Sequence, residues 1–235
     1  MAKKNEQVQA QEQVVESLNK SEAFFLKYKK PIIAAIVALI VIIVGFMLVK
    51  QYVLEPRENE ASTALAKGQE LMNAQQFDKA LKGDGATFGG FLKIASDYSG
   101  TDAGNLANLY AGLCYANQEK PDWKKALEYV EQFDTKGDQL ISPASQMALG
   151  DIYANNDQLD KAVESFKKAA DMADSKAEDK LNYSIAPLAL RKAGIILESQ
   201  NKKAEANAIY KQIKEKYINS PIRQDIDKYI ERTAE

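Results

Sequence analysis

The sequence contains one long run of apolar residues close to its N-terminus. From Ile32 to Val49, 18 consecutive positions are apolar or glycine, with no polar interruption. At 1.5 Å per helical residue this run extends about 27 Å, close to the thickness of the hydrocarbon core of a bilayer. A core helix of a soluble protein would normally show a polar face. The pattern therefore predicts a transmembrane helix at residues 31–50, with residues 32–49 in contact with lipid.

A cleavable signal peptide is the alternative interpretation of this run. The 30 residues before it, its length and the lack of a small-residue cleavage site shortly after it favour an uncleaved anchor. Basic residues are crowded before the run and thinly spread after it, as Lys20, Lys27, Lys29 and Lys30 on one side and Lys50, Arg57 and Lys67 on the other. By the positive-inside rule, the N-terminus is expected in the cytoplasm and the C-terminal domain outside.

The remaining chain divides around this anchor. Residues 1–30 are expected to form a cytoplasmic tail in which Val14 to Phe25 partly follow helical spacing, so this stretch either lies on the inner leaflet or contacts a membrane partner. Residues 51–60 are interpreted as a linker, with Pro56 as its hinge. Residues 61–235 then form the outer domain.

Residues 143–176 carry a periodic pattern of small and aromatic residues. Leu149, Gly150 and Tyr153 on one predicted helix are followed by Ala162 and Phe166 on the next. These residues resemble the tetratricopeptide-repeat (TPR) signature. The small residues let paired helices approach closely, and the aromatic residues fill the space between pairs. The resemblance implies helical hairpins that stack into a solenoid.

The same spacing recurs along the outer domain. Taking Gly150 as the anchor of one unit, the others are anchored by Gly68, Gly112 and Gly194, each followed at 12 to 14 residues by Ala80, Ala126 and Ala206 respectively. Pro143 and Pro187 occupy the same repeat position, the first turn of a first helix, where the missing N–H is tolerated. We therefore predict an all-α fold, an α-solenoid of about four repeats, closed by a polar capping helix at 222–232.

Two segments depart from regular repeats. In repeat 1 the second helix is interrupted at 82–90, which holds four glycines and must be a loop or a sharply bent junction before 91–98 resumes. A phosphate-binding loop is disfavoured there, because no strand precedes it and no Gly-Lys-Ser/Thr follows. The charged insert 171–182 is expected to extend a helix and then to loop.

The composition argues against catalysis and metal binding. The chain has no histidine and one cysteine, Cys114, which lies in an apolar stretch and is interpreted as a small buried hydrophobe. We expect no cofactor, no metal site and no catalytic residue, and hence no enzyme. The outer domain is mildly acidic, with 24 basic against 29 acidic residues after position 50. No basic patch favours nucleic acid.

TPR arrays usually bind peptide segments on the concave face of their first helices. The resemblance places eleven residues there: Gln69, Asn73, Leu109, Leu113, Asn117, Met147, Asp151, Asn155, Arg191, Ile195 and Glu198. Asn73, Asn117 and Asn155 share one repeat position near the end of a helix. Their amides are interpreted either as left-handed helix caps, which is favoured, or as a ladder that bonds a peptide backbone.

The whole architecture resembles the YfgM type of bacterial inner-membrane protein. The segment Thr101–Gly112 and the motif Tyr217–Pro221 resemble bacterial envelope TPR proteins more generally, including Bacteroidota variants, and the insertion Gly83–Gly90 departs from the simplest pattern. The resemblance implies an inner-membrane protein with a periplasmic domain, and an ancillary or chaperone-like role at the Sec translocon. Its partners would be translocon subunits, a periplasmic chaperone or envelope proteins.

Two other functions remain open at this stage. One is an adaptor that organises an envelope complex for division or outer-membrane assembly and recognises folded partners. The other is a hydrolase with a carboxylate pair. Asp151, Asp157 and Asp160 would be its candidates, yet each is readily explained as a groove, turn or helix-start residue.

Overall fold

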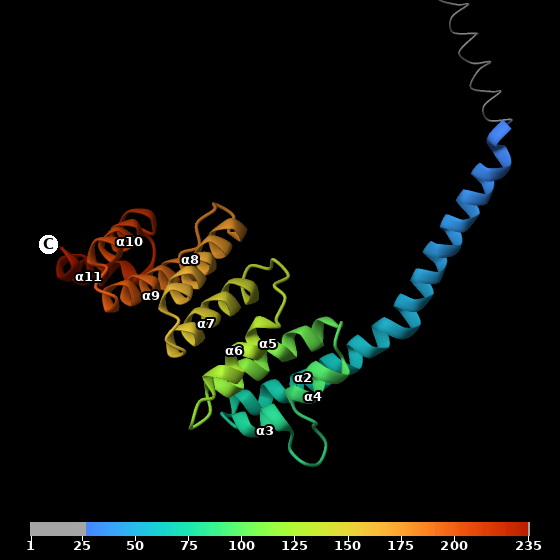
Figure 1. The fold of residues 1–235 in the computed structure, drawn as a ribbon, viewed down its shortest axis with the longest axis horizontal. Helices are drawn as coiled ribbons and strands as arrows, with labels where there is room; N and C mark the ends of the chain where they lie inside the picture. The colour runs from blue at the N-terminus through green and yellow to red at the C-terminus, as the bar shows by residue number, and fades with distance from the viewer. Residues whose placement is uncertain (1–26, 235) are drawn as a thin grey trace, which may run out of the picture. The chain divides into compact units, whose positions relative to one another are not determined.

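The computed structural model describes residues 27–234, whose regular elements are all helical (Figure 1). They belong to two compact units, Met1–Pro56 and Arg57–Glu235. In the first unit the helical backbone begins at Lys27, and the apolar side chains from Ile33 to Val49 are exposed. By length and composition this helix is able to cross a membrane. Residues 1–26 of the expected tail, which include its amphipathic segment, lie outside the described residues.

The segment interpreted as a linker, residues 51–60, is helical throughout. Lys50–Leu54 forms a π-helical turn in which the Glu55 N–H bonds the Lys50 carbonyl, and α2 (Glu55–Asn73) follows directly. Pro56 has no N–H to donate and its ring collides with the carbonyl four residues earlier in a regular helix. A π-turn just before it widens the backbone at that point. The proline is thus accommodated within a helix and does not end it.

Within the described part of the second unit, four helical hairpins follow one another (Figure 1). In chain order they are α2 with α3 (Phe77–Lys82) and α4 (Phe91–Asp97), α5 (Asp102–Ala116) with α6 (Trp123–Glu131), α7 (Ile141–Asn155) with α8 (Leu159–Lys176), and α9 (Ile185–Ser199) with α10 (Lys203–Lys216). Pro143 and Pro187 lie in the first turns of α7 and α9. The predicted number and phase of the repeats are confirmed.

The glycine of each first helix marks the closest approach to its hairpin partner. A methyl group on Gly150 would lie 2.6 Å from the ring of Phe166, and one on Gly194 would collide with Tyr210. In the second hairpin Val130 takes this place against Gly112. In each of these three hairpins the opposing residue comes four positions after the recurring alanine, one helical turn along the second helix.

The first hairpin closes the same gap by another route. The position four residues after Ala80 is Asp84, which lies in the loop between α3 and α4, and the rings of Phe88 and Phe91 face Gly68 instead. The Asp84 carboxylate accepts bonds of 2.8 to 3.0 Å from the backbone N–H groups of residues 86–88. These bonds, led by that of Phe88, hold its pKa well below the usual range. The glycine segment is therefore an ordered loop that places an aromatic residue.

The buried apolar residues of the solenoid form two clusters. One extends from Ala61 to Val130 and includes Ile152 of α7, and the other extends from Ala162 to Ile226. The boundary between the two clusters comes after α6. This helix has only 9 residues, half the 18 of α8. After α6 the chain runs without a helix to Ile141, so there is no long second helix to pack along α7 there.

The C-terminal segment covers the last hairpin. It consists of a 3₁₀ turn, Pro221–Gln224, and α11 (Ile226–Thr233), in place of one continuous helix over 222–232. Ile226 is fully buried against α10, while most other side chains of α11 are exposed. One apolar edge and a polar outer face are what a terminal cap of a solenoid requires.

Candidate functional site

The eleven predicted groove residues all lie on the first helices of the hairpins, α2, α5, α7 and α9, or directly after them. Two hydrogen bonds between side chains join neighbouring first helices within the described residues. Gln69 Nε2 donates to Tyr110 Oη at 2.6 Å, from α2 to α5, and Lys192 Nζ donates to Asp151 Oδ1 at 2.6 Å, from α9 to α7. The structure thus places first helices side by side, as the TPR resemblance implies. Whether peptide binds there stays a prediction.

Some of these residues are buried or already bind other residues of the chain. Leu109 is buried in the first core cluster, with 4% of its surface exposed. Glu198 binds Arg232 of α11 through both oxygens, at 2.7 and 2.8 Å, and also accepts a bond from the Tyr210 hydroxyl. Burial raises the pKa of Glu198, but these hydrogen bonds outweigh it and lower the pKa overall. Glu198 therefore fastens the C-terminal cap.

The three repeating asparagines do not adopt the left-handed conformation, so that part of the prediction is wrong. In the turns between the two helices of the first, third and fourth hairpins, the left-handed residues are Gln75, Asp157 and Asn201, at φ between 57 and 60°. In the first and third hairpins the left-handed residue lies two positions after the asparagine that ends the helix. The residue after it, Gln76 or Gln158, donates its backbone N–H to the carbonyl five residues earlier. The amides of Asn117 and Asn155 instead bond carbonyls of their own last helical turn.

The aspartates considered as catalytic residues of a hydrolase have structural roles or partners within the fold. Asp151 is paired with Lys192, Asp157 is a left-handed turn residue, and Asp160 binds Gln200 and Lys202 at 2.9 Å. Burial raises the pKa of the Cys114 thiol to about 12, so this sulfur stays protonated at neutral pH. Among the described residues, no group of three His, Cys, Asp or Glu side chains is arranged to hold a metal ion.

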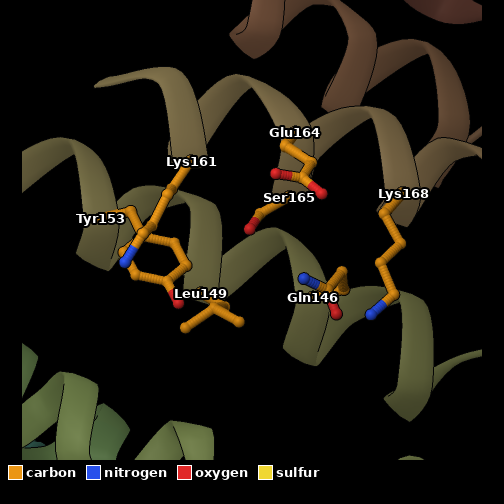
Figure 2. A pocket seen from close by; sticks show the side chains of 7 residues that line it. All are labelled: Gln146, Leu149, Tyr153, Lys161, Glu164, Ser165 and Lys168. Atoms are coloured by element: carbon orange, nitrogen blue, oxygen red, sulfur yellow. The ribbon is translucent and has the colours of Figure 1, made fainter. Parts of the chain in front are cut away.

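Sequence reasoning missed a pocket between α7 and α8, with a volume of about 320 Å³ (Figure 2). Its lining residues come from α7 and α8 alone and differ from those of the predicted groove: Gln146, Leu149, Tyr153, Lys161, Glu164, Ser165 and Lys168. The hydroxyl of Ser165 and the amide of Gln146 point into the space between the two helices (Figure 2).

The wall of this pocket nearest α6 is fixed by Tyr153. Its hydroxyl donates to Glu131 Oε1 at 2.6 Å, at the last residue of α6. Burial first, and then this bond, raise the pKa of Tyr153 to about 12, so the phenol remains neutral. The ammonium of Lys161 lies 5.2 Å from the centre of the same ring. The ring is thus held in place by a cation on one side and a carboxylate at its tip.

A signal in the sequence could have found the pocket. With Gly150 and Gly194 aligned, Gln146 corresponds to Leu190 and Ser165 corresponds to Ile209, and both residues of the fourth hairpin are buried and apolar. The third hairpin therefore has polar side chains at two positions where the fourth has apolar ones. A polar residue at a core position is the unusual observation.

Comparison with known proteins supports the fold and nothing finer. No family model matches the sequence, and no curated protein sequence matches it. Among solved structures, the chain is similar to the nearly identical TPR-like repeats of a kinesin-light-chain-like protein of Podosopora anserina and to a single-residue variant of the same protein. Each comparison has a TM-score of 0.58 and 12% sequence identity and covers 75% of this chain, with 86% and 85% of the other. The described chain thus combines an apolar N-terminal helix with a TPR-like α-solenoid.

Proposed function

We propose that this chain is a membrane-anchored, non-enzymatic scaffold that binds other proteins through its solenoid. The observation that carries the proposal is the TPR-like solenoid that follows an apolar helix able to cross a membrane. Stacked helical hairpins present extended surfaces that suit protein partners. The unreactive Cys114 thiol and the engaged carboxylates of Asp151 and Asp160 support a role in binding instead of catalysis.

The proposed location is a bacterial inner membrane, with the N-terminus in the cytoplasm and the solenoid in the periplasm. The lysines crowded before residue 32 support this orientation. Alkaline phosphatase fused after Glu235 tests it, because that enzyme is active only outside the cytoplasm. High activity is expected from the fusion. A fusion without activity, together with an active cytoplasmic reporter at the same site, would reverse the orientation.

The finer proposal is an ancillary or chaperone-like role at the Sec translocon, in which the solenoid holds or hands on emerging envelope proteins. Its support is the architectural resemblance to the YfgM type. The test is crosslinking in cells, purification in mild detergent and mass spectrometry, with the full chain compared with a form lacking residues 32–49. Translocon subunits and a periplasmic chaperone should be recovered with the full chain and lost with the shortened form.

The same experiment distinguishes the alternative adaptor role. Recovery of division or outer-membrane assembly proteins, with no secretion machinery, would replace the translocon proposal while leaving the scaffold intact. Recovery of no protein at all above the background of an unrelated membrane-anchored control would contradict the scaffold itself. Depletion of the protein adds a second distinction, since a secretion defect and a division defect differ in phenotype.

A further inference from the structure

The pocket between α7 and α8 is lined by two polar side chains that make no hydrogen bond within the described part of the chain. Gln146 has 8% and Ser165 has 5% of its surface exposed. Neither the Gln146 amide nor the Ser165 hydroxyl makes a hydrogen bond to any residue in the described part of the chain, although both line the pocket. Neither belongs to the buried polar atoms that lack a partner, so both groups open onto the pocket and are reached by water there. A partner from outside the chain would satisfy both.

The fourth hairpin shows that the fold does not need these polar groups. Leu190 and Ile209 occupy the equivalent positions there and pack into the second core cluster. Since the two hairpins share their glycine and aromatic contacts, the third hairpin would accept the same apolar pair on grounds of packing. The polar pair is therefore a local departure that the packing of the fold does not require, which is typical of sites kept for binding.

Two of the three charged residues that line the pocket are basic. Lys161 and Lys168 stand on the α8 side, one turn to either side of Glu164, and none of the three forms an ion pair within the described chain (Figure 2). Glu131 is occupied by the Tyr153 hydroxyl. The outer domain as a whole carries more acidic than basic residues, whereas the lining of the pocket holds two lysines and one glutamate. Apolar contact is offered by Leu149 and by the ring of Tyr153.

We propose that this pocket binds an extended peptide segment in which an acidic side chain neighbours an apolar one. The carboxylate lies between the ammonium groups of Lys161 and Lys168, and the apolar side chain contacts Leu149 and Tyr153. The peptide backbone, which offers one donor and one acceptor per residue, pairs with Gln146 and Ser165. A space of about 320 Å³ accepts a short stretch of chain. The inference rests on the proposed scaffold function and assigns it a ligand class.

Fluorescence anisotropy with the full chain in detergent micelles tests the ligand class. The probe is a labelled peptide that alternates leucine and aspartate, compared with one that alternates leucine and lysine and one that alternates serine and aspartate. The leucine–aspartate peptide should bind roughly tenfold more tightly than either of the others, because it alone supplies both the charge and the apolar contact. Equal binding of the leucine–lysine peptide, or no saturable binding of any peptide, would overturn the proposal.

Two pairs of substitutions locate the binding. Gln146→Leu with Ser165→Ile gives the third hairpin the side chains of the fourth, and is expected to abolish binding while the thermal midpoint is unchanged or higher. Lys161→Glu with Lys168→Glu should weaken binding of the leucine–aspartate peptide by roughly tenfold or more. The matched control reverses two exposed lysines of α8 and α10 that do not line the pocket, Lys167→Glu with Lys211→Glu, and should leave the affinity unchanged.

The purification experiment separates this inference from the scaffold role. If the full chain and its Gln146→Leu, Ser165→Ile form recover the same partners in the same amounts, and the peptide affinity is also unaltered, the pocket assignment is wrong and the scaffold stands. Displacement of the labelled peptide by millimolar succinate as readily as by unlabelled peptide would also overturn the assignment, since it would indicate a site for small carboxylates. If the full chain recovers no partner, the scaffold proposal is the one that fails.

Discussion

The first and third hairpins close the same interface in different ways. In the third, Phe166 lies one helical turn after Ala162 on an unbroken α8 and packs against Gly150. In the first, the second helix stops after Lys82, and a glycine loop carries the chain to Phe91, whose ring reaches Gly68. The comparison shows that the space opposite the glycine must be filled by a large side chain. That side chain need not come from one fixed position on the second helix.

The two halves of the solenoid, which are the first and second hairpins and the third and fourth hairpins, also differ in the polar contacts that link their helices. In the second half the buried carboxylate of Asp174 on α8 binds Lys216 at 2.6 Å, the Tyr217 hydroxyl at 2.7 Å and the backbone N–H of Asn182 at 2.8 Å. It thereby joins the third hairpin to the end of the fourth. In the first half, Glu58 accepts bonds from the first backbone N–H groups of α5, which is a capping contact at a helix end.

The largest expected effects come from removing the two aromatic rings. Phe91→Ala and Phe166→Ala should each lower the free energy of unfolding by about 3–5 kcal/mol, since each leaves a cavity opposite a glycine. Urea denaturation of the full chain in mild detergent measures this. Ile218→Ala, at a side chain with 57% of its surface exposed, is the control and should change little. If Phe91→Ala cost under about 1 kcal/mol, its equivalence to Phe166 would be lost.

A somewhat smaller effect is expected at the link between the third and fourth hairpins. Asp174→Ala leaves the Tyr217 hydroxyl and the Lys216 ammonium without their carboxylate, and should cost about 3 kcal/mol. The control is Asp171→Ala, an exposed position on the same helix. If the two variants unfolded at the same urea concentration, Asp174 would not hold the second half together.

These contrasts show which features of the fold were predictable. The glycine and alanine spacing predicted four hairpins, because helix pairs can approach only where side chains are small. It did not predict that Phe91 replaces a residue at the Asp84 position, since the path of a loop is a tertiary outcome. Pro56 is interpreted from the sequence as the hinge to the outer domain, and the structure places this proline in a helix directly after a π-turn. The predicted groove positions lie on the expected helices, and their binding role stays a prediction.

The pocket was missed for a related physical reason. A serine or glutamine on an amphipathic helix reads as a solvated position unless repeats are aligned residue by residue. Only the comparison of Gln146 with Leu190, and of Ser165 with Ile209, identifies these positions as core positions. The bonds of Asp174 to Lys216 and Tyr217 were equally hidden, since these partners lie 42 and 43 residues away along the chain and depend on the packing of α8 against the fourth hairpin.

The junction between the two halves provides a prediction of intermediate size. Asp138 lies just before α7 and accepts bonds from the backbone N–H groups of Leu140, Ile141 and Ser142 and from the Ser142 hydroxyl. Burial raises the pKa of Asp138, but these bonds outweigh it and lower the pKa to about 2. Asp138→Ala removes this cap and should destabilise the chain by about 1 kcal/mol at neutral pH.

The pH dependence has a definite sign. A carboxyl group whose pKa is lower in the folded state binds protons more readily when unfolded, so its contribution is complete above the ordinary value of 3.8 and is lost as the pH falls through about 2. The gap in urea midpoint between wild type and Asp138→Ala should therefore narrow between pH 5 and pH 2. Asp134→Asn, where the side chain is exposed, should show no such narrowing. A constant gap would contradict the capping role.

The smallest expected effect concerns the ion pair between α7 and α9. Lys192 and Asp151 retain 39% and 45% exposure of their side chains, so water screens their attraction. A double-mutant cycle with Lys192→Ala and Asp151→Ala should give a coupling of about 0.2–1 kcal/mol, typical of exposed pairs. A coupling above about 2 kcal/mol would mean that the pair links neighbouring hairpins as strongly as a buried contact does. The weak value is expected because the second core cluster already joins α8 to α9, so that stability does not depend on this pair.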